Sequence, residues 1–152
     1  MIEYKDGNIL DEKVDAIVNA VNCVGVMGKG LAKQFKNKYP SNFKSYVLAC
    51  LVGDVQPGKL HIFDTEGIPK YIVNLPTKKH WCSNSSLEYI NLGLKELINF
   101  ITKHNIQSIA IPAIGCGLGG LKWDDVRSLI ELHMNQVHNV RVVIFNPIRK
   151  GL

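Results

Sequence analysis

The chain has 152 residues, of which 46% are hydrophobic and 20% are charged, with a formal net charge of +5. We expect one folded domain over residues 1–152, since this length and composition exclude an intrinsically disordered, collagen-like or coiled-coil protein. No apolar run approaches the roughly 20 residues of a membrane helix, and Met1–Lys5 does not begin a secretory signal, so we expect a soluble, cytoplasmic protein without a membrane partner.

Six short segments rich in β-branched residues predict strands, each bounded by Gly, Pro, Asn or Asp. In chain order they are Ile2–Lys5, Ala16–Ala20, Leu60–Asp64, Tyr71–Leu75, Ser108–Pro112 and Val140–Phe145. Four segments between the strands have apolar residues at helical spacing. They are Gly30–Lys38, a segment that Ser41 caps after Pro40, Ser86–His104, and a last helix capped by Asp124 or Asp125.

The alternation of strands and helices predicts the fold class. We expect an α/β domain, a three-layer α/β/α sandwich around a six-stranded mixed, largely parallel sheet. In such sheets the ligand crevice lies beyond the carboxyl ends of the strands. The expected location of a site is therefore the loops that follow Ala20, Leu75, Pro112 and Phe145.

Basic residues are concentrated in part of the chain. No acidic residue lies between Asp15 and Asp54, and this stretch contains Lys29, Lys33, Lys36, Lys38 and Lys44. Such segregation favours an anionic partner, such as a nucleotide or nucleic acid, although a solvated basic surface explains any one cluster equally well. The four cysteines include no Cys-x-x-Cys pair, so we expect no metal site, no disulfide framework and no other cofactor.

Two of the expected loops are rich in glycine. The first has Gly25, Gly28 and Gly30 and leads into the basic helix, and the second has four glycines within residues 115–120. The backbone amides of a glycine-rich loop and the N-terminus of a helix both favour a phosphate, so the two loops together predict a bound diphosphate. A role in turning the chain fits the first loop equally well.

Motifs in these loops resemble a known family. The motifs are the Gly7-Asn-Ile9 turn, Asn19-Ala-Val-Asn22 before the first glycines, and Ile114-Gly-Cys-Gly-Leu-Gly-Gly-Leu121. Over almost the whole chain they resemble the macrodomains, which bind ADP-ribose. Residues 25–30, 76–81 and 117–123 are most similar to macrodomains of the DarG type, antitoxins that remove ADP-ribose from DNA. They are less closely similar to the terminal ADP-ribose protein glycohydrolases.

The resemblance implies that ADP-ribose lies across the two glycine-rich loops. The implied contact residues are Asn8, Ile9, Asn22, Gly28, Lys29, Gly30, Leu31, Thr77, Gly115, Cys116, Gly117, Leu118, Gly119, Gly120, Phe145 and Asn146. Asn22 is expected near the distal ribose. Asn8 stands where most macrodomains have an aspartate that accepts from the adenine amino group, and an uncharged amide predicts weaker adenine binding. Phe145 suits the adenine side of the site and suits the core equally.

The resemblance also implies a catalytic residue. In the related glycohydrolases the lysine directly after a threonine is catalytic, which carries over to Lys78. Its amine can attack the anomeric carbon of the ribose when burial or a neighbouring cation such as Lys79 favours the neutral form, or it can stabilise leaving-group charge as a cation. An aspartate that helps to resolve the lysine intermediate in terminal ADP-ribose protein glycohydrolases is replaced by Gly119. Without the resemblance, both lysines are typical of solvated surface charges.

Aromatic and basic residues follow Lys78. Lys79, His80 and Trp81 are expected to contact nucleic acid, because stacking beside cations is a common way to hold single strands, whereas Trp123 suits the core. We therefore expect an ADP-ribosyl glycohydrolase that removes mono-ADP-ribose from a nucleobase of single-stranded DNA and reverses a cognate ADP-ribosyltransferase toxin. The alternatives are hydrolysis of ADP-ribose from acidic protein side chains, or a non-catalytic ADP-ribose reader.

Overall fold

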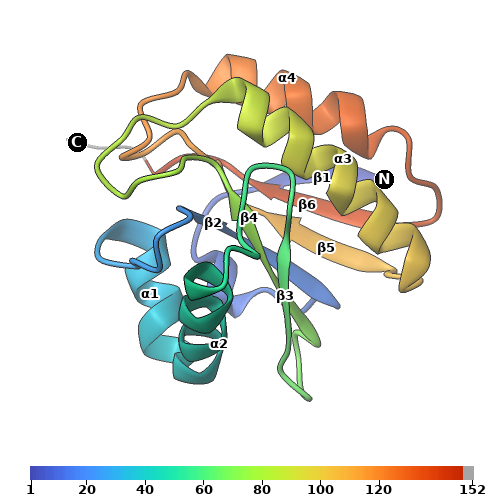
Figure 1. Ribbon diagram of the computed structural model, residues 1–152. Helices are drawn as coiled ribbons and strands as arrows, with labels where there is room; N and C mark the ends of the chain where they lie inside the picture. Colours follow the sequence, from blue (N-terminus) through green and yellow to red (C-terminus); the bar gives the residue numbers. More distant parts are fainter. Residues whose placement is uncertain (149–152) are drawn as a thin grey trace.

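The computed structural model describes residues 1–148, which form six strands and four α-helices (Figure 1). The strands are β1 (Ile2–Lys5), β2 (Ala16–Val21), β3 (His61–Asp64), β4 (Tyr71–Pro76), β5 (Ser108–Ile111) and β6 (Arg141–Phe145). The helices are α1 (Gly30–Lys38), α2 (Pro40–Leu51), α3 (Leu87–Lys103) and α4 (Trp123–Met134), and the 3-10 helix η1 (Ile9–Asp11) follows β1. None of the described helices has the length and apolar character needed to span a membrane.

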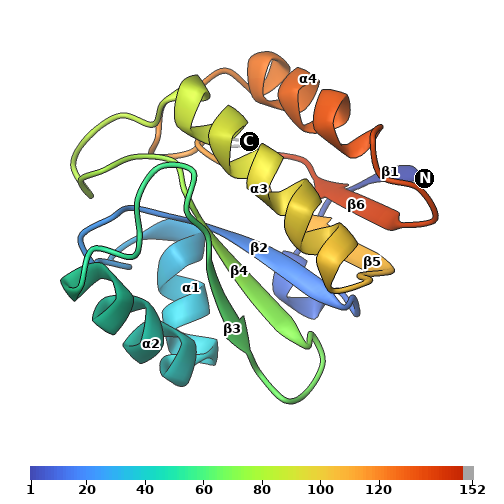
Figure 2. The ribbon, with the colours of Figure 1, turned by 45° about the vertical axis from the view of Figure 1, so that its right-hand side comes forward.

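The strands form one sheet in the order β1-β6-β5-β2-β4-β3. Neighbouring strands pair in parallel, except that β3 pairs with β4 in the antiparallel direction. Helices α1 and α2 cover one face of the sheet, and α3 and α4 cover the other (Figures 1 and 2). The predicted three-layer sandwich with a mixed, largely parallel sheet is confirmed.

The central strands are buried on both faces. Val18 and Val73 pack into the core on the side of α3 and α4. Their neighbours Ile17 and Ile72 point to the other face and pack with Phe35 of α1. Because successive side chains of a strand point to opposite faces, strands covered on both sides must be apolar throughout. This explains the nearly continuous apolar runs of the sequence.

Two of the predicted helix caps are wrong. Helix α2 begins at Pro40, with no cap from Ser41, because the fixed φ of proline and its missing N–H suit the first helical position. Helix α4 begins at Trp123, so Asp124 and Asp125 lie within its first turn. There the two carboxylates compensate the positive end of the helix dipole instead of capping it.

Candidate active site

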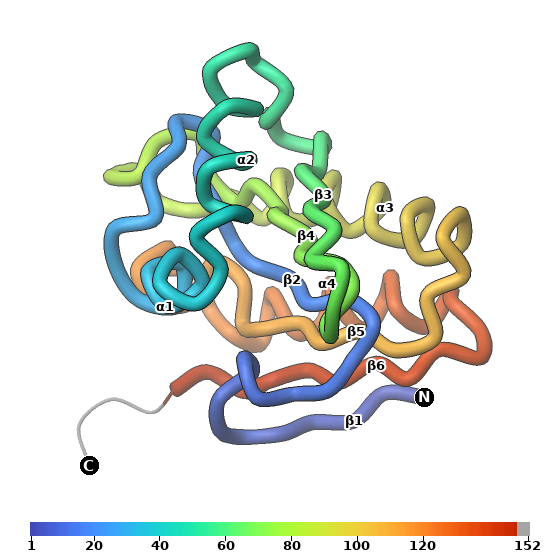
Figure 3. Tube along the Cα trace, turned by 90° about the horizontal axis from the view of Figure 1, so that it is seen from below, coloured from blue at the N-terminus to red at the C-terminus, as the bar shows by residue number. Residues whose placement is uncertain are grey.

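Three loops follow the carboxyl ends of β2, β4 and β5 and lie at one end of the sheet (Figures 1 and 3). In this order they are the first glycine loop, the lysine loop and the second glycine loop, which comprise residues 22–30, 77–86 and 112–122. Cys23 N donates to Lys79 O at 2.9 Å and joins the first glycine loop to the lysine loop. Ser85 N donates to Gly119 O at 2.9 Å and joins the lysine loop to the second glycine loop. The fold thus joins three of the four loops that the sequence analysis selected, whereas the segment after Phe145 bonds to β1 through Asn146 N and Lys5 O.

The buried side chain of Asn22 holds the first glycine loop in place through hydrogen bonds to the backbone of that loop. The residue is only 5% exposed, and its Oδ1 accepts hydrogen bonds from Val24 N at 3.0 Å and Val26 N at 3.3 Å. Its Nδ2 donates to Val26 O at 2.7 Å. Since an amide nitrogen carries two hydrogens, one remains for a ligand. Asn22 therefore organises the loop, and its contact with a distal ribose stays a prediction.

The first glycine loop ends at the N-terminus of α1. Lys29 occupies the N-cap position without a side-chain hydrogen bond to the helix. The first backbone N–H groups of any helix have no intrahelical acceptor, and without a side-chain cap those of Gly30 and Leu31 are available to an anion. Leu118 of the second glycine loop lies opposite, because a Cβ added to Gly30 would be 3.8 Å from its Cδ1. An anion bound at this helix end would lie beside both glycine loops.

Lysines without a neighbouring carboxylate follow the first glycine loop along α1. Lys29, Lys33 and Lys36 are exposed, and no carboxylate within residues 1–148 forms an ion pair with them. Lys36 instead lies over the ring of Phe43, with Nζ 4.6 Å from the ring centre. Lysines without neighbouring carboxylates produce a positive potential that attracts phosphate groups.

The second glycine loop excludes a side chain at position 119. A Cβ added to Gly119 would lie 2.5 Å from Gly115 O and would clash with Ser85 Oγ. The packing therefore leaves no room for the aspartate that the resemblance to terminal ADP-ribose protein glycohydrolases implies at this position. Gly117 differs, because no atom lies within 4 Å of a Cβ added there. Gly117, Leu118 and Gly120 are the exposed predicted contacts of this loop.

Lys78 is half-buried in the lysine loop. Its Nζ donates to Trp81 O at 3.1 Å, and in the described part of the chain no carboxylate pairs with it. The Cys23 thiol donates to Lys78 O with an S–O distance of 3.6 Å, which fixes the backbone of the lysine from the first glycine loop. Thr77 is buried, and its Oγ1 accepts from Ser85 Oγ at 3.1 Å. The lysine loop is hydrogen-bonded to both glycine loops. It therefore holds beside them an amine that no described carboxylate neutralises.

The predicted nucleic-acid residues are accessible. Lys79 and His80 are exposed, and Trp81 is 56% exposed. Trp123, by contrast, is half-buried against the core formed with α3 and α4, as expected from the sequence. Trp81 is thus the indole of this region that can stack on a base without disturbing the core.

The two thiols beside the site are poor nucleophiles. Burial raises the pKa of Cys23 and of Cys116 to about 11 in each case. Both thiols are therefore protonated near neutral pH, and the thiolate is the reactive form of cysteine. Within residues 1–148, moreover, no cluster of His, Cys, Asp and Glu has the arrangement of a metal site.

The residues expected on the adenine side have structural roles. Asn8 Oδ1 accepts from Leu10 N at 3.0 Å and caps η1, and Ile9 is buried. Phe145 lies in the core beside α1, which is the alternative that its sequence position left open. Asn146 Nδ2 donates to Asp6 Oδ1 at 3.0 Å. Contacts of these residues with adenine stay predictions.

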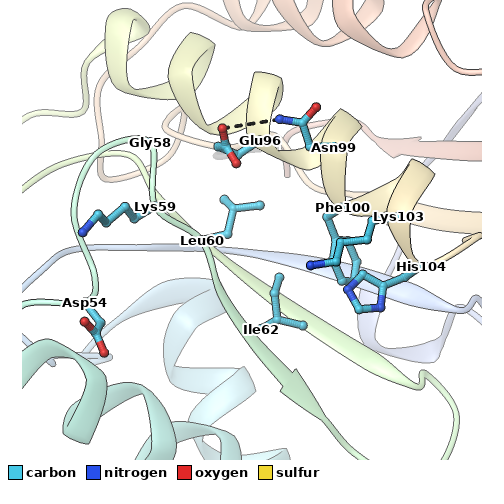
Figure 4. Close-up of a pocket in the computed structure, with 10 residues that line it drawn as sticks. All are labelled: Asp54, Gly58, Lys59, Leu60, Ile62, Glu96, Asn99, Phe100, Lys103 and His104. Atoms are coloured by element: carbon cyan, nitrogen blue, oxygen red, sulfur yellow. Dashed lines mark hydrogen bonds between the residues drawn. The ribbon is translucent and has the colours of Figure 1, made fainter.

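A groove of about 430 Å³ lies elsewhere, between β3 and α3 (Figure 4). Its lining residues are Asp54, Gly58, Lys59, Leu60, Ile62, Glu96, Asn99, Phe100, Lys103 and His104. None of them belongs to the three loops, and the lining mixes cations and carboxylates over an apolar floor. Its α3 residues come from the second half of that helix, so no helix N-terminus opens into the groove, in contrast to the candidate site at the start of α1.

Sequence analysis missed two buried hydroxyls that support the loops. Ser85 Oγ bonds to Thr77, and the Tyr46 hydroxyl of α2 bonds to Asn22. Neither belongs to a motif. A tyrosine among the apolar residues Phe43, Val47 and Cys50 of one helix is the signal that could have indicated Tyr46, because a buried phenol usually has a hydrogen-bond partner.

The Macro domain family matches residues 18–130 of the chain. The chain belongs to the macrodomain family. It is 48% identical over 149 residues to a DNA ADP-ribosyl glycohydrolase of Mycobacterium tuberculosis, which covers 97% of the chain. The solved macrodomain of Mycobacterium tuberculosis DarG superposes with a TM-score of 0.96 at 47% identity, covering 97% of this chain and 99% of that one. The predicted similarity to DarG-type macrodomains is thus confirmed.

Two more distant relatives complete the comparison. The structure of Thermosipho africanus DarTG in complex with ADP-ribose superposes with a TM-score of 0.92 at 30% identity, covering 99% of this chain and 43% of that one. Its curated counterpart is a DNA ADP-ribosyl transferase-DNA ADP-ribosyl glycohydrolase fusion protein. Human ADP-ribose glycohydrolase OARD1 is 25% identical over 145 residues, which are 95% of this chain and 90% of that protein. The chain spans 42% of the length of the Mycobacterium tuberculosis relative.

Proposed function

We propose that this macrodomain is an ADP-ribosyl glycohydrolase that removes mono-ADP-ribose from a nucleobase of single-stranded DNA. The observation that carries the proposal is the junction of the lysine loop with both glycine loops, through Cys23 and Ser85. The junction joins the lysine loop to the first glycine loop, which leads into the α1 N-terminus, and this supports a site formed by all three loops. Relatives named DNA ADP-ribosyl glycohydrolase, at up to 48% identity over most of the chain, support the same activity.

The proposed chemistry uses Lys78 at the anomeric carbon of the distal ribose. As a nucleophile, its neutral amine forms a bond to that carbon while the bond to the nucleobase nitrogen breaks, and the nitrogen keeps the electron pair and takes up a proton. Water then replaces the lysine and releases ADP-ribose. As a cation, Lys78 would instead stabilise negative charge on the departing base. Either route proceeds without an aspartate at position 119, which excludes a side chain.

Single-stranded DNA would be held beside the reacting bond. Trp81 is exposed for stacking, and a stacked base contributes about 1–3 kcal/mol. Lys79 and the α1 lysines supply unpaired charge for phosphates. The proposed reaction reverses the modification made by a cognate ADP-ribosyltransferase. The fusion of both activities in the Thermosipho africanus relative supports this partner. We place this antitoxin-like reaction in the cytoplasm.

The decisive experiment offers two substrates side by side. One is a single-stranded oligonucleotide with ADP-ribose on a base, and the other is a protein with ADP-ribose on acidic side chains. We expect release of free ADP-ribose from the oligonucleotide, and loss of this release in Lys78→Ala. Faster release from the protein would favour the acidic-side-chain hydrolase, and ADP-ribose binding without release from either would favour a reader.

A further inference from the structure

The hydroxyl of Tyr46 makes contacts that packing alone does not require. Tyr46 lies on α2, is fully buried, and shares an apolar cluster with Val21, Met27 and Val55. Its hydroxyl oxygen lies 2.7 Å from Asn22 O and 2.8 Å from Asn22 Oδ1. A phenylalanine would fill the same apolar cluster. The hydroxyl is therefore explained by Asn22, the residue that closes the first glycine loop.

The orientation of Asn22 depends on this hydroxyl, because both acceptor oxygens of Asn22 lie within hydrogen-bond distance of it. Asn22 Oδ1 already accepts from Val24 N and Val26 N, and the phenol of α2 lies within hydrogen-bond distance of this oxygen as well. The backbone carbonyl of Asn22 shares the single hydrogen of the same hydroxyl. Without the phenol, a buried carbonyl would lose its donor, and one of the bonds that fix the amide plane of Asn22 would be lost.

The effect of Tyr46 extends to the lysine loop through the next residue in the chain. Cys23 N donates to Lys79 O, and the Cys23 thiol donates to Lys78 O. Asn22 and Cys23 are adjacent, so a shift of Asn22 moves the two donors that hold the backbone of Lys78 and Lys79. A continuous chain of hydrogen bonds and one peptide link thus connects α2 to the candidate catalytic lysine.

We propose that Tyr46 is a positioning residue of the site: its hydroxyl sets the orientation of Asn22, and through it the first glycine loop and the backbone of Lys78. The proposal rests on the proposed function as far as catalysis is concerned. Its structural part concerns the order of the loop and is measurable without any substrate.

The matched variants are Tyr46→Phe and Tyr39→Phe. Tyr39 is half-buried at the junction of α1 and α2, and its hydroxyl has no hydrogen-bond partner among the described residues. In Tyr46→Phe, we expect the amide hydrogens of Val24 and Val26 to exchange with solvent at least tenfold faster, while amides of the central strands keep their wild-type rates. Tyr39→Phe should leave the loop amides unchanged.

Ligand binding and turnover test the link to function. Tyr46→Phe should weaken ADP-ribose binding about tenfold by calorimetry and lower kcat for release from ADP-ribosylated DNA, and Tyr39→Phe should alter neither. In a double-mutant cycle, Asn22→Ala should lower affinity, and adding Tyr46→Phe should lower it little further, because the hydroxyl acts on the loop through the Asn22 side chain, which alanine removes. Asn22→Ala alone should also loosen Val24 and Val26, which provides a second variant for the exchange measurement.

The outcomes separate this inference from the proposed function. Wild-type exchange rates at Val24 and Val26 in Tyr46→Phe, or additive effects in the cycle, would overturn the positioning role. A uniform rise in exchange over the whole sheet would also overturn it, because that result indicates a general contribution to stability. Wild-type protein that releases no ADP-ribose would refute the proposed function alone, since the exchange and binding measurements would still decide the role of Tyr46.

Discussion

Alanine at position 119 should destabilise the protein far more than alanine at position 117, although both positions lie on the second glycine loop. A Cβ at Gly119 meets backbone atoms that cannot rotate away, Gly115 O at 2.5 Å and Gly115 C at 2.9 Å. A Cβ at Gly117 meets no atom within 4 Å. Neither glycine has the positive φ that disfavours other residues, so the comparison isolates the steric effect.

The magnitude follows from the cost of overpacking. Inserting a carbon into a packed region costs about 1–3 kcal/mol. In a domain of this size, each kcal/mol lowers the midpoint of thermal unfolding by about 2–4 °C, so Gly119→Ala should lower it by about 2–12 °C. Gly117→Ala should change it by less than about 2 °C, because surface substitutions usually stay within about 0.5 kcal/mol.

Calorimetric unfolding of wild type and both variants measures these shifts. Gly119→Asp is the sharper test, because it introduces the aspartate that the resemblance to terminal ADP-ribose protein glycohydrolases implies at this position. We expect it to destabilise the protein at least as much as Gly119→Ala and to leave hydrolysis no faster. A thermally stable Gly119→Asp variant with faster release of ADP-ribose would refute the steric reasoning.

Three further predictions concern the site and its support. Lys78→Ala should abolish most release of ADP-ribose while ADP-ribose affinity stays within about threefold by calorimetry, because the lost interaction belongs to the transition state. Near-normal hydrolysis by this variant would exclude the lysine mechanism. Lys79→Ala should flatten the salt dependence of binding to ADP-ribosylated DNA but not to free ADP-ribose, so equal slopes in variant and wild type would contradict a phosphate contact. Burial lowers the pKa of His61, whose Nδ1 lies 2.9 Å from Asn74 Nδ2, so below pH 6.5 the unfolded chain binds a proton that the folded chain does not. The free energy of unfolding should therefore fall as pH drops below about 6.5, with a smaller slope in His61→Gln, and an unchanged slope in denaturant titrations would reject His61 as the cause.

Local patterns in the sequence determined the elements and the place of the site. The apolar face of α3, from Ile90 to Ile101, repeats with the period of a helix, and the doubly buried strands are short, nearly continuous apolar runs. Both patterns are visible in a short window of the sequence. The loops beyond β2, β4 and β5 followed from the rule for parallel sheets. The predicted N-caps of α2 and α4 lie two or three residues beyond the observed N-caps, Tyr39 and Lys122, because neither of these residues caps its helix with a side-chain hydrogen bond that the sequence could indicate.

Only the tertiary structure decided which groups are already engaged. Asn8 and Asn22 look like free ligand donors in their motifs, yet their side chains cap η1 and close the first glycine loop. Tyr46 and Asn22 are 24 residues apart, and the exclusion of a side chain at Gly119 depends on Ser85, on another loop. A sequence specifies which polar groups exist, whereas their partners depend on which strands are neighbours and how the loops after those strands pack together.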